Sequence, residues 1–194
     1  MKSVLISIQP KWCELIASGK KTVEVRKTRP KIETPFKCYI YCTNTKTMGD
    51  LILCKSKENT DLFDYNSVKG INKGFAQAED IQLKGKVIGE FVCDHVMRHC
   101  EMENADIAEQ QSRVKREKIF EYANGKEVFG WHISDLVIYE QPKELREFCK
   151  LGVCPCDAKS VLHCTKNMSF CAKRNLKRPP QSWCYVERKE DEGK

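Results

Sequence analysis

The chain has 194 residues, of which 41% are hydrophobic and 31% are charged, and this composition fits a globular protein with a core of its own. No stretch approaches the roughly 18 consecutive apolar residues of a membrane helix, and the N-terminus lacks the small-residue cleavage site of an export signal, so we expect no membrane partner and a cytoplasmic location. The net charge of +7 permits an anionic partner without requiring one.

The first part of the chain predicts three strands and one helix. Residues 10–19 predict the helix, because Pro10 suits the first helical position and Gly19 suits a C-terminal stop. The strands are predicted over residues 3–8, 21–27 and 36–43.

The remainder predicts further strands that are separated by insertions. Residues 44–84 are polar and poorly periodic, which indicates an irregular insertion with one short helix around 75–80. Strands are predicted over 85–99 with a bend near Asp94, within 124–140, and over 182–186; helices are predicted over 103–123 and 142–149. Because strands and helices do not alternate regularly, we expect a mainly β or α+β fold, a mixed and mostly antiparallel small barrel with a few flanking helices. We expect one domain over 1–194, with insertions at about 44–84 and 149–177.

The stretch GKKTVEVRK, residues 19–27, places charges on a strand that otherwise looks buried. Side chains alternate between the faces of a strand, so Glu24 and Arg26 share one face. Val23 and Val25 lie on the other face, which we expect to face the core. Glu24 and Arg26 then point outward or into a cleft, close enough for an ion pair or for joint contact with a ligand. Lys21 has the opposite parity. It can join Glu24 and Arg26 only if it lies at the start of the strand, after the chain turns at Gly19. The alternative is a solvated strand face.

The pattern Gly19-x-Lys21-x-x-Glu24-x-Arg26, placed after a strand and a short helix, resembles the ASCH domain of the PUA-like superfamily. The segments GKVIGEFVCD, GWHISDLVIY and PPQSWCYV are also similar to segments of ASCH proteins from bacteria and their phages. This resemblance implies a small PUA-like β-barrel with a cleft beside the first helix, lined by the residues of the pattern. It also implies RNA or a modified nucleotide as the partner, because RNA binding is the usual proposal for the family.

The resemblance gives each cleft residue an expected role. Arg26 would hold a phosphate or a base edge, Glu24 would orient Arg26 or accept from an amino group, and Lys21 would add positive charge. Trp12 would stack on a base, or it would pack in the core, because it belongs to the apolar stripe of its helix.

Two other functions stay open. Some small ASCH proteins hydrolyse amides of acylated cytidine, and another has been described as a ribonuclease; in an enzyme, Lys21 and Glu24 would be the catalytic pair. The amidohydrolases have a Thr where this chain has Glu24, and a carboxylate does not replace a hydroxyl nucleophile. The third possibility is a phage-associated interaction module, for which the sequence identifies no protein partner.

The chain has 12 cysteines. Seven are scattered, and several of these lie in apolar strand patterns typical of small core residues: Cys13, Cys38, Cys42, Cys54, Cys93, Cys100 and Cys184. The other five lie close together, and four of them would suffice for a structural zinc ion: Cys149, Cys154, Cys156, Cys164 and Cys171. None of their spacings is the C-x2-C pair of a zinc ribbon, so free thiols and disulfides remain alternatives.

A basic patch follows at Lys173, Arg174, Lys177 and Arg178, which would extend an anion-binding surface or form a solvated loop.

The histidines give a weaker signal. Strand parity places Cys93, His95 and His99 on one face, which suggests a metal site as a minor alternative. His132 and Ser134 share a face with no evident nucleophile partner, so we interpret His132 as a structural histidine.

Overall fold

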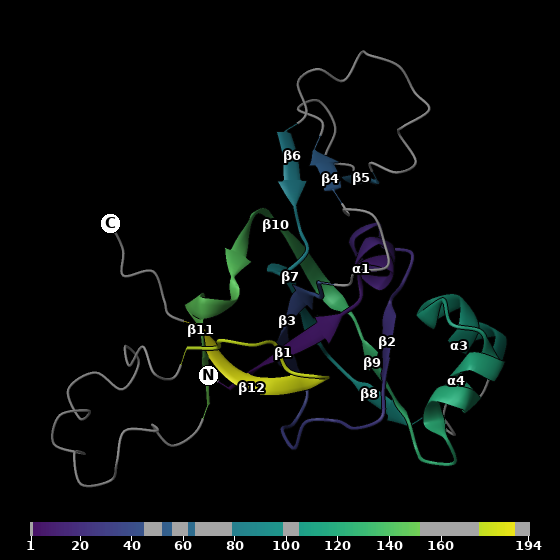
Figure 1. Ribbon diagram of the computed structural model, residues 1–194. Helices are drawn as coiled ribbons and strands as arrows, with labels where there is room; N and C mark the ends of the chain where they lie inside the picture. Colours follow the sequence, from purple (N-terminus) through teal and green to yellow (C-terminus); the bar gives the residue numbers. More distant parts are fainter. Residues whose placement is uncertain are drawn as a thin grey trace, which may run out of the picture.

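The computed structural model describes residues 2–44, 52–55, 62–64, 79–98, 105–151 and 175–188 (Figure 1). Most of the regular structure in these residues is β-strand, arranged in one mixed and two antiparallel sheets, which confirms the mainly β or α+β class. Within the described part of the chain, every helix is too short or too polar to cross a membrane.

The largest sheet has six strands in the order β10-β7-β3-β1-β12-β11. The strands are β1 (Ser3–Ile8), β3 (Phe36–Cys42), β7 (Lys86–Cys93), β10 (Ser134–Glu144), β11 (Phe148–Lys150) and β12 (Trp183–Arg188). The pair β1 and β3 is parallel and the other pairs are antiparallel. The first and last described strands are therefore neighbours, which brings residues 182–186 beside the N-terminal segment.

Two smaller sheets complete the described strands. One has the order β2-β9-β8, with β2 (Val23–Arg26), β9 (Phe129–His132) and β8 (Val96–Arg98). The other has the order β5-β4-β6, with β5 (Leu62–Asp64), β4 (Ile52–Lys55) and β6 (Glu79–Gln82). The predicted strand over 85–99 does bend near Asp94, and there it divides between two sheets as β7 and β8.

Two predictions about local structure were wrong. Residues 142–149 are not a helix: β10 runs through Pro142 to Glu144, a 3-10 turn (Leu145–Glu147) follows, and β11 begins at Phe148. Because β10 lies at the sheet edge it tolerates a proline, and burial of Phe148 against β12 favours the extended backbone. In the insertion, the strands β4, β5 and β6 replace irregular chain, and residues 79–80 are strand rather than helix. The rest of the helix predicted around 75–80 lies outside the described residues.

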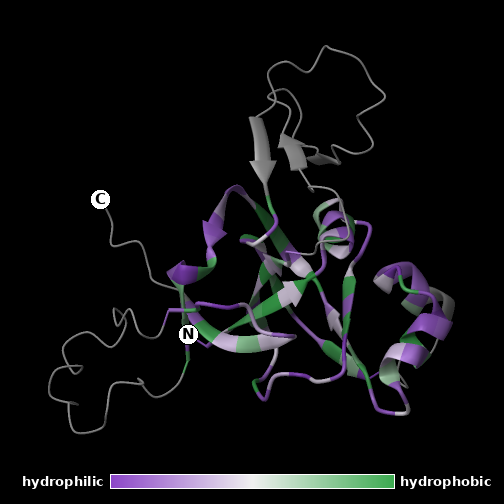
Figure 2. Ribbon diagram, viewed as in Figure 1, coloured by the Kyte–Doolittle hydropathy of each residue, from purple (hydrophilic) through white to green (hydrophobic). Residues whose placement is uncertain are grey.

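The helical prediction over 103–123 is confirmed as two short helices. They are α3 (Ala105–Ser112) and α4 (Arg116–Ala123), and Arg113 between them has a left-handed φ of 56°. Both helices are largely hydrophilic (Figure 2). In α4 only one face is buried, where Ile119 and Ala123 pack with Val128. The first helix, α1 (Pro10–Ala17), packs beside β1 and β3.

The main core lies between the six-stranded sheet and the β2-β9-β8 sheet. It combines aliphatic residues of β1 and β3 with Phe91 of β7 and Trp131 of β9, which is fully buried. The strands around it carry many hydrophobic residues (Figure 2). Four cysteines that were interpreted as core residues belong to it, all of them free thiols: Cys13, Cys38, Cys42 and Cys93.

We predict that the buried thiols make the fold sensitive to alkali. Burial raises the pKa of Cys38 well above its usual value, so the folded chain keeps a proton that the unfolded chain releases above about pH 8.5. The stabilisation is complete below that pH and is lost as the pH rises, by about 1.4 kcal/mol per pH unit for one thiol. The difference in unfolding free energy between wild type and Cys38→Ala should therefore shrink by about 1 kcal/mol between pH 8.5 and 9.5 in urea titrations, because the full slope is reached only above the pKa of the unfolded thiol. Parallel pH profiles for the two proteins would contradict the prediction.

Candidate functional site

The predicted site begins where α1 ends. Gly19 has a φ of 69°, a left-handed conformation that suits glycine after a helix, and its N–H donates to Ile16 O. The chain then turns so that the Lys21 N–H donates to Leu15 O, 2.9 Å away. Lys21 thus lies just before β2 starts at Val23, at the mouth of the strand, which is the position its parity required.

Lys21, Glu24 and Arg26 form one buried ionic network. Glu24 Oε2 lies 3.3 Å from Lys21 Nζ, and Glu24 Oε1 lies 3.0 Å from Arg26 Nη2. The three residues are only 2%, 6% and 8% exposed. Such burial is unusual for charged side chains unless they are paired, so the solvated strand face is excluded and Glu24 is held between two cations.

Lys21 uses all of its donors within the protein. Besides Glu24, its Nζ donates to Val23 O at 2.8 Å and to Ser112 O at 2.6 Å. Ser112 ends α3, where a cation also interacts favourably with the free carbonyls and the helix dipole. Burial lowers the pKa of Lys21 from its usual value, and the Glu24 carboxylate opposes that shift. Lys21 therefore fixes Glu24 and α3 relative to β2.

Arg26 connects β2 to the six-stranded sheet. Its Nη2 donates to Ser7 O of β1 at 2.6 Å, and its Nη1 reaches Ser182 Oγ at 3.4 Å. Its Nε is buried, and no partner for it is found among the described residues. Thr43 Oγ1, just after β3, is likewise buried without a partner in that part of the structure. Buried polar groups of this kind ordinarily have a hydrogen-bond partner, which a ligand or an ordered water would supply.

A cleft of about 520 Å³ opens over this network, lined by residues of α1, β2 and α4. Its size is in the range of small-molecule pockets. Its polar lining includes the three network residues and Thr43, and its aromatic lining consists of Trp12 and Tyr122. The complete lining is Ser7, Ile8, Gln9, Trp12, Lys21, Glu24, Val25, Arg26, Thr43, Val114, Ile119, Tyr122 and Gln181.

Trp12 packs against the core, as one of its two predicted roles requires, and its stacking on a base stays a prediction. Its ring packs against the edge of the core and also lines the cleft, with Lys21 Nζ 5.1 Å from the ring centre. Sequence reasoning missed Thr43, Tyr122 and Gln181. The last two come from distant segments, and no local pattern marks them, because only the packing of α4 and the chain before β12 brings them to the cleft.

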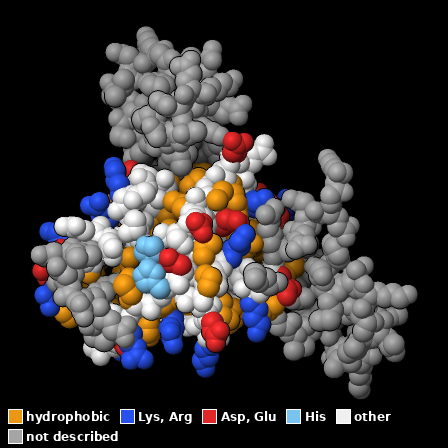
Figure 3. All heavy atoms as spheres, turned by 180° about the vertical axis from the view of Figure 1, so that it is seen from behind, with side chains coloured by type: hydrophobic (Ala, Val, Ile, Leu, Met, Phe, Trp, Pro, Cys, Tyr) orange, Lys and Arg blue, Asp and Glu red, His pale blue; other side chains and the backbone are white. Residues whose placement is uncertain are grey.

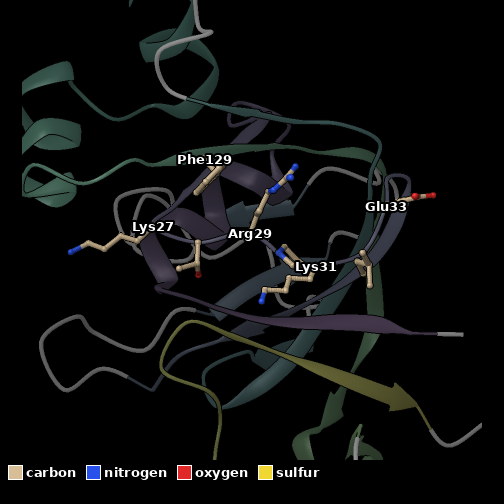
Figure 4. Close-up of a pocket in the computed structure, with 8 residues that line it drawn as sticks. Lys27, Arg29, Lys31, Glu33 and Phe129 are labelled. Carbon is tan, nitrogen blue, oxygen red and sulfur yellow. The ribbon is translucent and has the colours of Figure 1, made fainter.

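A second hollow, of about 550 Å³, lies where the chain leaves β2 (Figure 4). It is lined by residues 27–33 and by Phe129, which pairs with Arg26 across the sheet. We call residues 27–33 the basic loop, because it contains Lys27, Arg29 and Lys31.

The basic loop is attached to β12 and adjoins the cleft. Trp183 Nε1 donates to Thr28 Oγ1 at 3.0 Å, and the Lys31 N–H donates to Tyr185 Oη at 2.7 Å. Lys27 Nζ lies 4.7 Å from the ring centre of Tyr122, a residue of the cleft wall. The basic loop therefore continues the surface of the cleft.

The remaining predicted sites involve histidines, cysteines and a basic patch. Cys93 is buried and its thiol donates to His95 O, so it does not share a surface with the His95 side chain; His99 lies outside the described residues. His95 instead lies against Asp94 and His132.

Of the five proposed zinc ligands only Cys149 is described. It is buried, and its Sγ lies 3.3 Å from Asn175 Oδ1. The other four cysteines, and Lys173 and Arg174 of the basic patch, lie outside the described residues, while Lys177 and Arg178 are exposed.

Comparison with known proteins finds one family model and several solved structures that are similar to this chain. The family model described as the ASCH domain matches residues 6–143, which is more than half of the chain. The crystal structure of ASCH from Zymomonas mobilis is similar at 16% identity, over 95% of this chain and 87% of that one, with a TM-score of 0.46. One mutant protein from the same organism matches at 16% identity, over 97% of this chain and 93% of that one, with a TM-score of 0.47. A second mutant protein matches at 15% identity, over 96% of this chain and 89% of that one, with the same TM-score. A comparison with curated proteins finds no match. The family match places the Lys21–Glu24–Arg26 network inside the matched region, and the chain belongs to the ASCH domain family.

Proposed function

We propose that this protein binds single-stranded RNA or a modified nucleotide in the cytoplasm, with one base in the cleft beside α1. The observation that carries the proposal is the pair of buried polar atoms in residues of the cleft wall, Arg26 Nε and Thr43 Oγ1, which have no partner in the described part of the chain. A base edge carries both donors and acceptors and would satisfy two such groups together.

The cleft suits a base in shape and chemistry. Trp12 and Tyr122 offer aromatic faces for stacking, and about 520 Å³ is room enough for one nucleoside. Glu24 holds the Arg26 guanidinium by an ion pair and Ser7 O holds it by a hydrogen bond, so the group is fixed before a ligand arrives. A fixed donor loses little entropy on binding.

The basic loop suits the phosphates that flank such a base. The structure gives Lys27, Arg29 and Lys31 no ion pair with any described acidic residue, and Glu33 points away from them (Figure 4). The three cationic side chains spread apart instead of converging on one point (Figure 4). This arrangement fits successive phosphates along a strand better than one isolated anion.

The geometry favours binding over hydrolysis. A lysine acts as a base or nucleophile only with a free lone pair, but Lys21 Nζ directs hydrogen bonds to three acceptors: Glu24, Val23 O and Ser112 O. An ammonium that donates to three acceptors has no lone pair to offer to a substrate. Hydrolysis of an acylated cytidine or of RNA remains the alternative; a protein that binds RNA without consuming it would exclude the second of these reactions.

The proposal is tested with a fluorescein-labelled single-stranded RNA ten-mer and with unlabelled CMP as a competitor. We expect a rise in anisotropy on addition of the protein, and displacement of the RNA by CMP at higher concentration, because both use the cleft. Gel analysis of the same RNA after incubation reports cleavage. Absence of binding to either probe would contradict the proposal and favour an interaction module.

We predict that the basic loop sets the salt dependence of RNA binding. In the variant K27Q/R29Q/K31Q, the slope of log K against log salt concentration should fall by about 2, because each phosphate contact to a single strand contributes about 0.7. CMP binding should change little, since the base still enters the cleft.

The control variant is K86Q/K143Q/K150Q, which removes the same charge from strands that line neither hollow. An equal fall in slope for both variants would show a nonspecific charge effect and would remove the basic loop from the proposed RNA path.

A further inference from the structure

A cluster of one carboxylate and two imidazoles lies outside the cleft and outside the basic loop. Asp94 and His95 occupy the connection between β7 and β8, and His132 ends β9. Histidine side chains gather on the surface there, with acidic atoms beside them (Figure 3). None of the three residues lines either hollow, so the proposed function leaves the cluster without a role.

The three side chains meet at one oxygen atom. Asp94 Oδ1 lies 2.7 Å from His132 Nδ1 and 3.0 Å from His95 Nδ1. The two imidazole rings are stacked, with centres 4.4 Å apart and an angle of 24° between their planes. One ligand atom from each residue lies within 4.8 Å of the others.

The backbone around the cluster holds this arrangement in place. The His132 N–H donates to His95 O at 3.1 Å, so the two histidines are joined through their main chains. Beside them, Val96 of β8 pairs with Trp131 of β9, and Trp131 is fully buried. The Cys93 thiol donates to His95 O from below. The cluster thus stands on strand ends fixed by the core, which is the support that a preorganised site needs.

Two imidazole nitrogens and one carboxylate oxygen are a donor set for first-row divalent ions such as Zn²⁺, Co²⁺ or Ni²⁺. Ligand atoms on a tetrahedral ion with bonds of about 2.0–2.1 Å lie about 3.3 Å apart. The nitrogen–oxygen separations of 2.7 and 3.0 Å fall a few tenths of an ångström short of this, so small rotations would open the cluster around an ion. Each neutral ring frees Nδ1 for the metal by carrying its proton on Nε2 instead.

We propose that Asp94, His95 and His132 form a binding site for a divalent transition-metal ion. The side chains are 42%, 49% and 28% exposed, so an ion enters from solvent without opening the core. Three protein ligands leave at least one position of a tetrahedral ion for water or for an outside donor, which is typical of an exchangeable site rather than a closed structural one.

Cobalt distinguishes this site from the cysteines of the chain. We expect one equivalent of Co²⁺ to bind with weak visible absorption and without the intense near-ultraviolet charge-transfer bands that thiolate ligands produce. The variants His132→Ala, His95→Ala and Asp94→Asn should each weaken this binding at least tenfold. Asp135→Asn is the matched control, because Asp135 is an exposed carboxylate on β10 outside the cluster, and it should bind Co²⁺ as wild type does.

Circular dichroism establishes that each variant is folded, and His95→Ala, whose side chain is half exposed in the connection between β7 and β8, keeps the test valid if His132→Ala does not fold. Two outcomes would overturn the proposal. One is Co²⁺ binding that shows only thiolate bands or is unchanged in all three cluster variants. The other is no Co²⁺ binding to the wild type, which would leave a hydrogen-bonded cluster only.

Discussion

Replacement of Glu24 with Gln should lower the free energy of unfolding by about 3 kcal/mol, near the lower end of the range for breaking a buried ion pair. The substitution keeps the shape of the side chain and removes its charge. Lys21 and Arg26 then remain as two buried cations without the carboxylate between them. We expect the lower end of the range because the network lines a cleft that water enters. Urea unfolding at pH 7 measures the change.

The matched control is Glu121→Gln. Glu121 pairs with Lys118 at 2.8 Å, but both side chains are about two-thirds exposed, and such surface pairs contribute little to stability. Equal losses in the two variants would mean that the Lys21–Glu24–Arg26 network is no more important than a surface ion pair. The structural basis of the candidate site would then fail.

Replacement of Arg26 with Lys should weaken binding of the RNA ten-mer and of CMP by about 10- to 100-fold, equivalent to losing one charged hydrogen bond of about 1.5–3 kcal/mol. Lysine keeps the positive charge beside Glu24 but lacks both Nε and the planar fork. The affinity is measured by anisotropy at fixed salt, at a temperature where circular dichroism shows the variant to be folded. Unchanged affinity would remove Arg26 from the set of ligand contacts.

Thr43→Val separates binding from stability in the same cleft. Valine has nearly the shape of threonine but removes the buried hydroxyl that lacks a partner among the described residues. Removing an unsatisfied buried group should leave the unfolding free energy equal or higher, by about 1 kcal/mol. Binding should nevertheless weaken, since the ligand loses a partner. A variant that is both less stable and unchanged in binding would show that this hydroxyl serves the fold alone.

Local pattern was sufficient for the fold of the first 43 residues. The strand at residues 3–8 and the helix that starts at Pro10 lie where the sequence predicts them, because apolar periodicity and helix-end signals act over a few residues. The alternation of β2 also placed Glu24 and Arg26 on one face and Val23 in the core. The motif of residues 19–26 is by itself sufficient to point to the family.

Pattern failed where distant contacts decide the local structure. Residues 142–149 begin with a proline, which is a helix-start signal, yet they continue β10 and form β11. Pairing with β12 and burial of Phe148 outweigh the helix propensity of the segment. Likewise, His95 was grouped with Cys93 and His99 by strand parity. The chain bends at Asp94, and this bend breaks the alternation and places His95 beside His132 instead.

The sequence by itself determined which charged residues share the face of β2, because the two-residue period of a strand is a local property. Only the tertiary structure decided what those charges do. One of the three acceptors of Lys21 Nζ is Ser112 O, 91 residues away along the chain. The guanidinium of Arg26 donates hydrogen bonds to Ser7 and Ser182. Burial by α1, α3 and α4 turns the two charges of β2 and the lysine that precedes it into a network, and this burial depends on packing between segments that no local pattern connects.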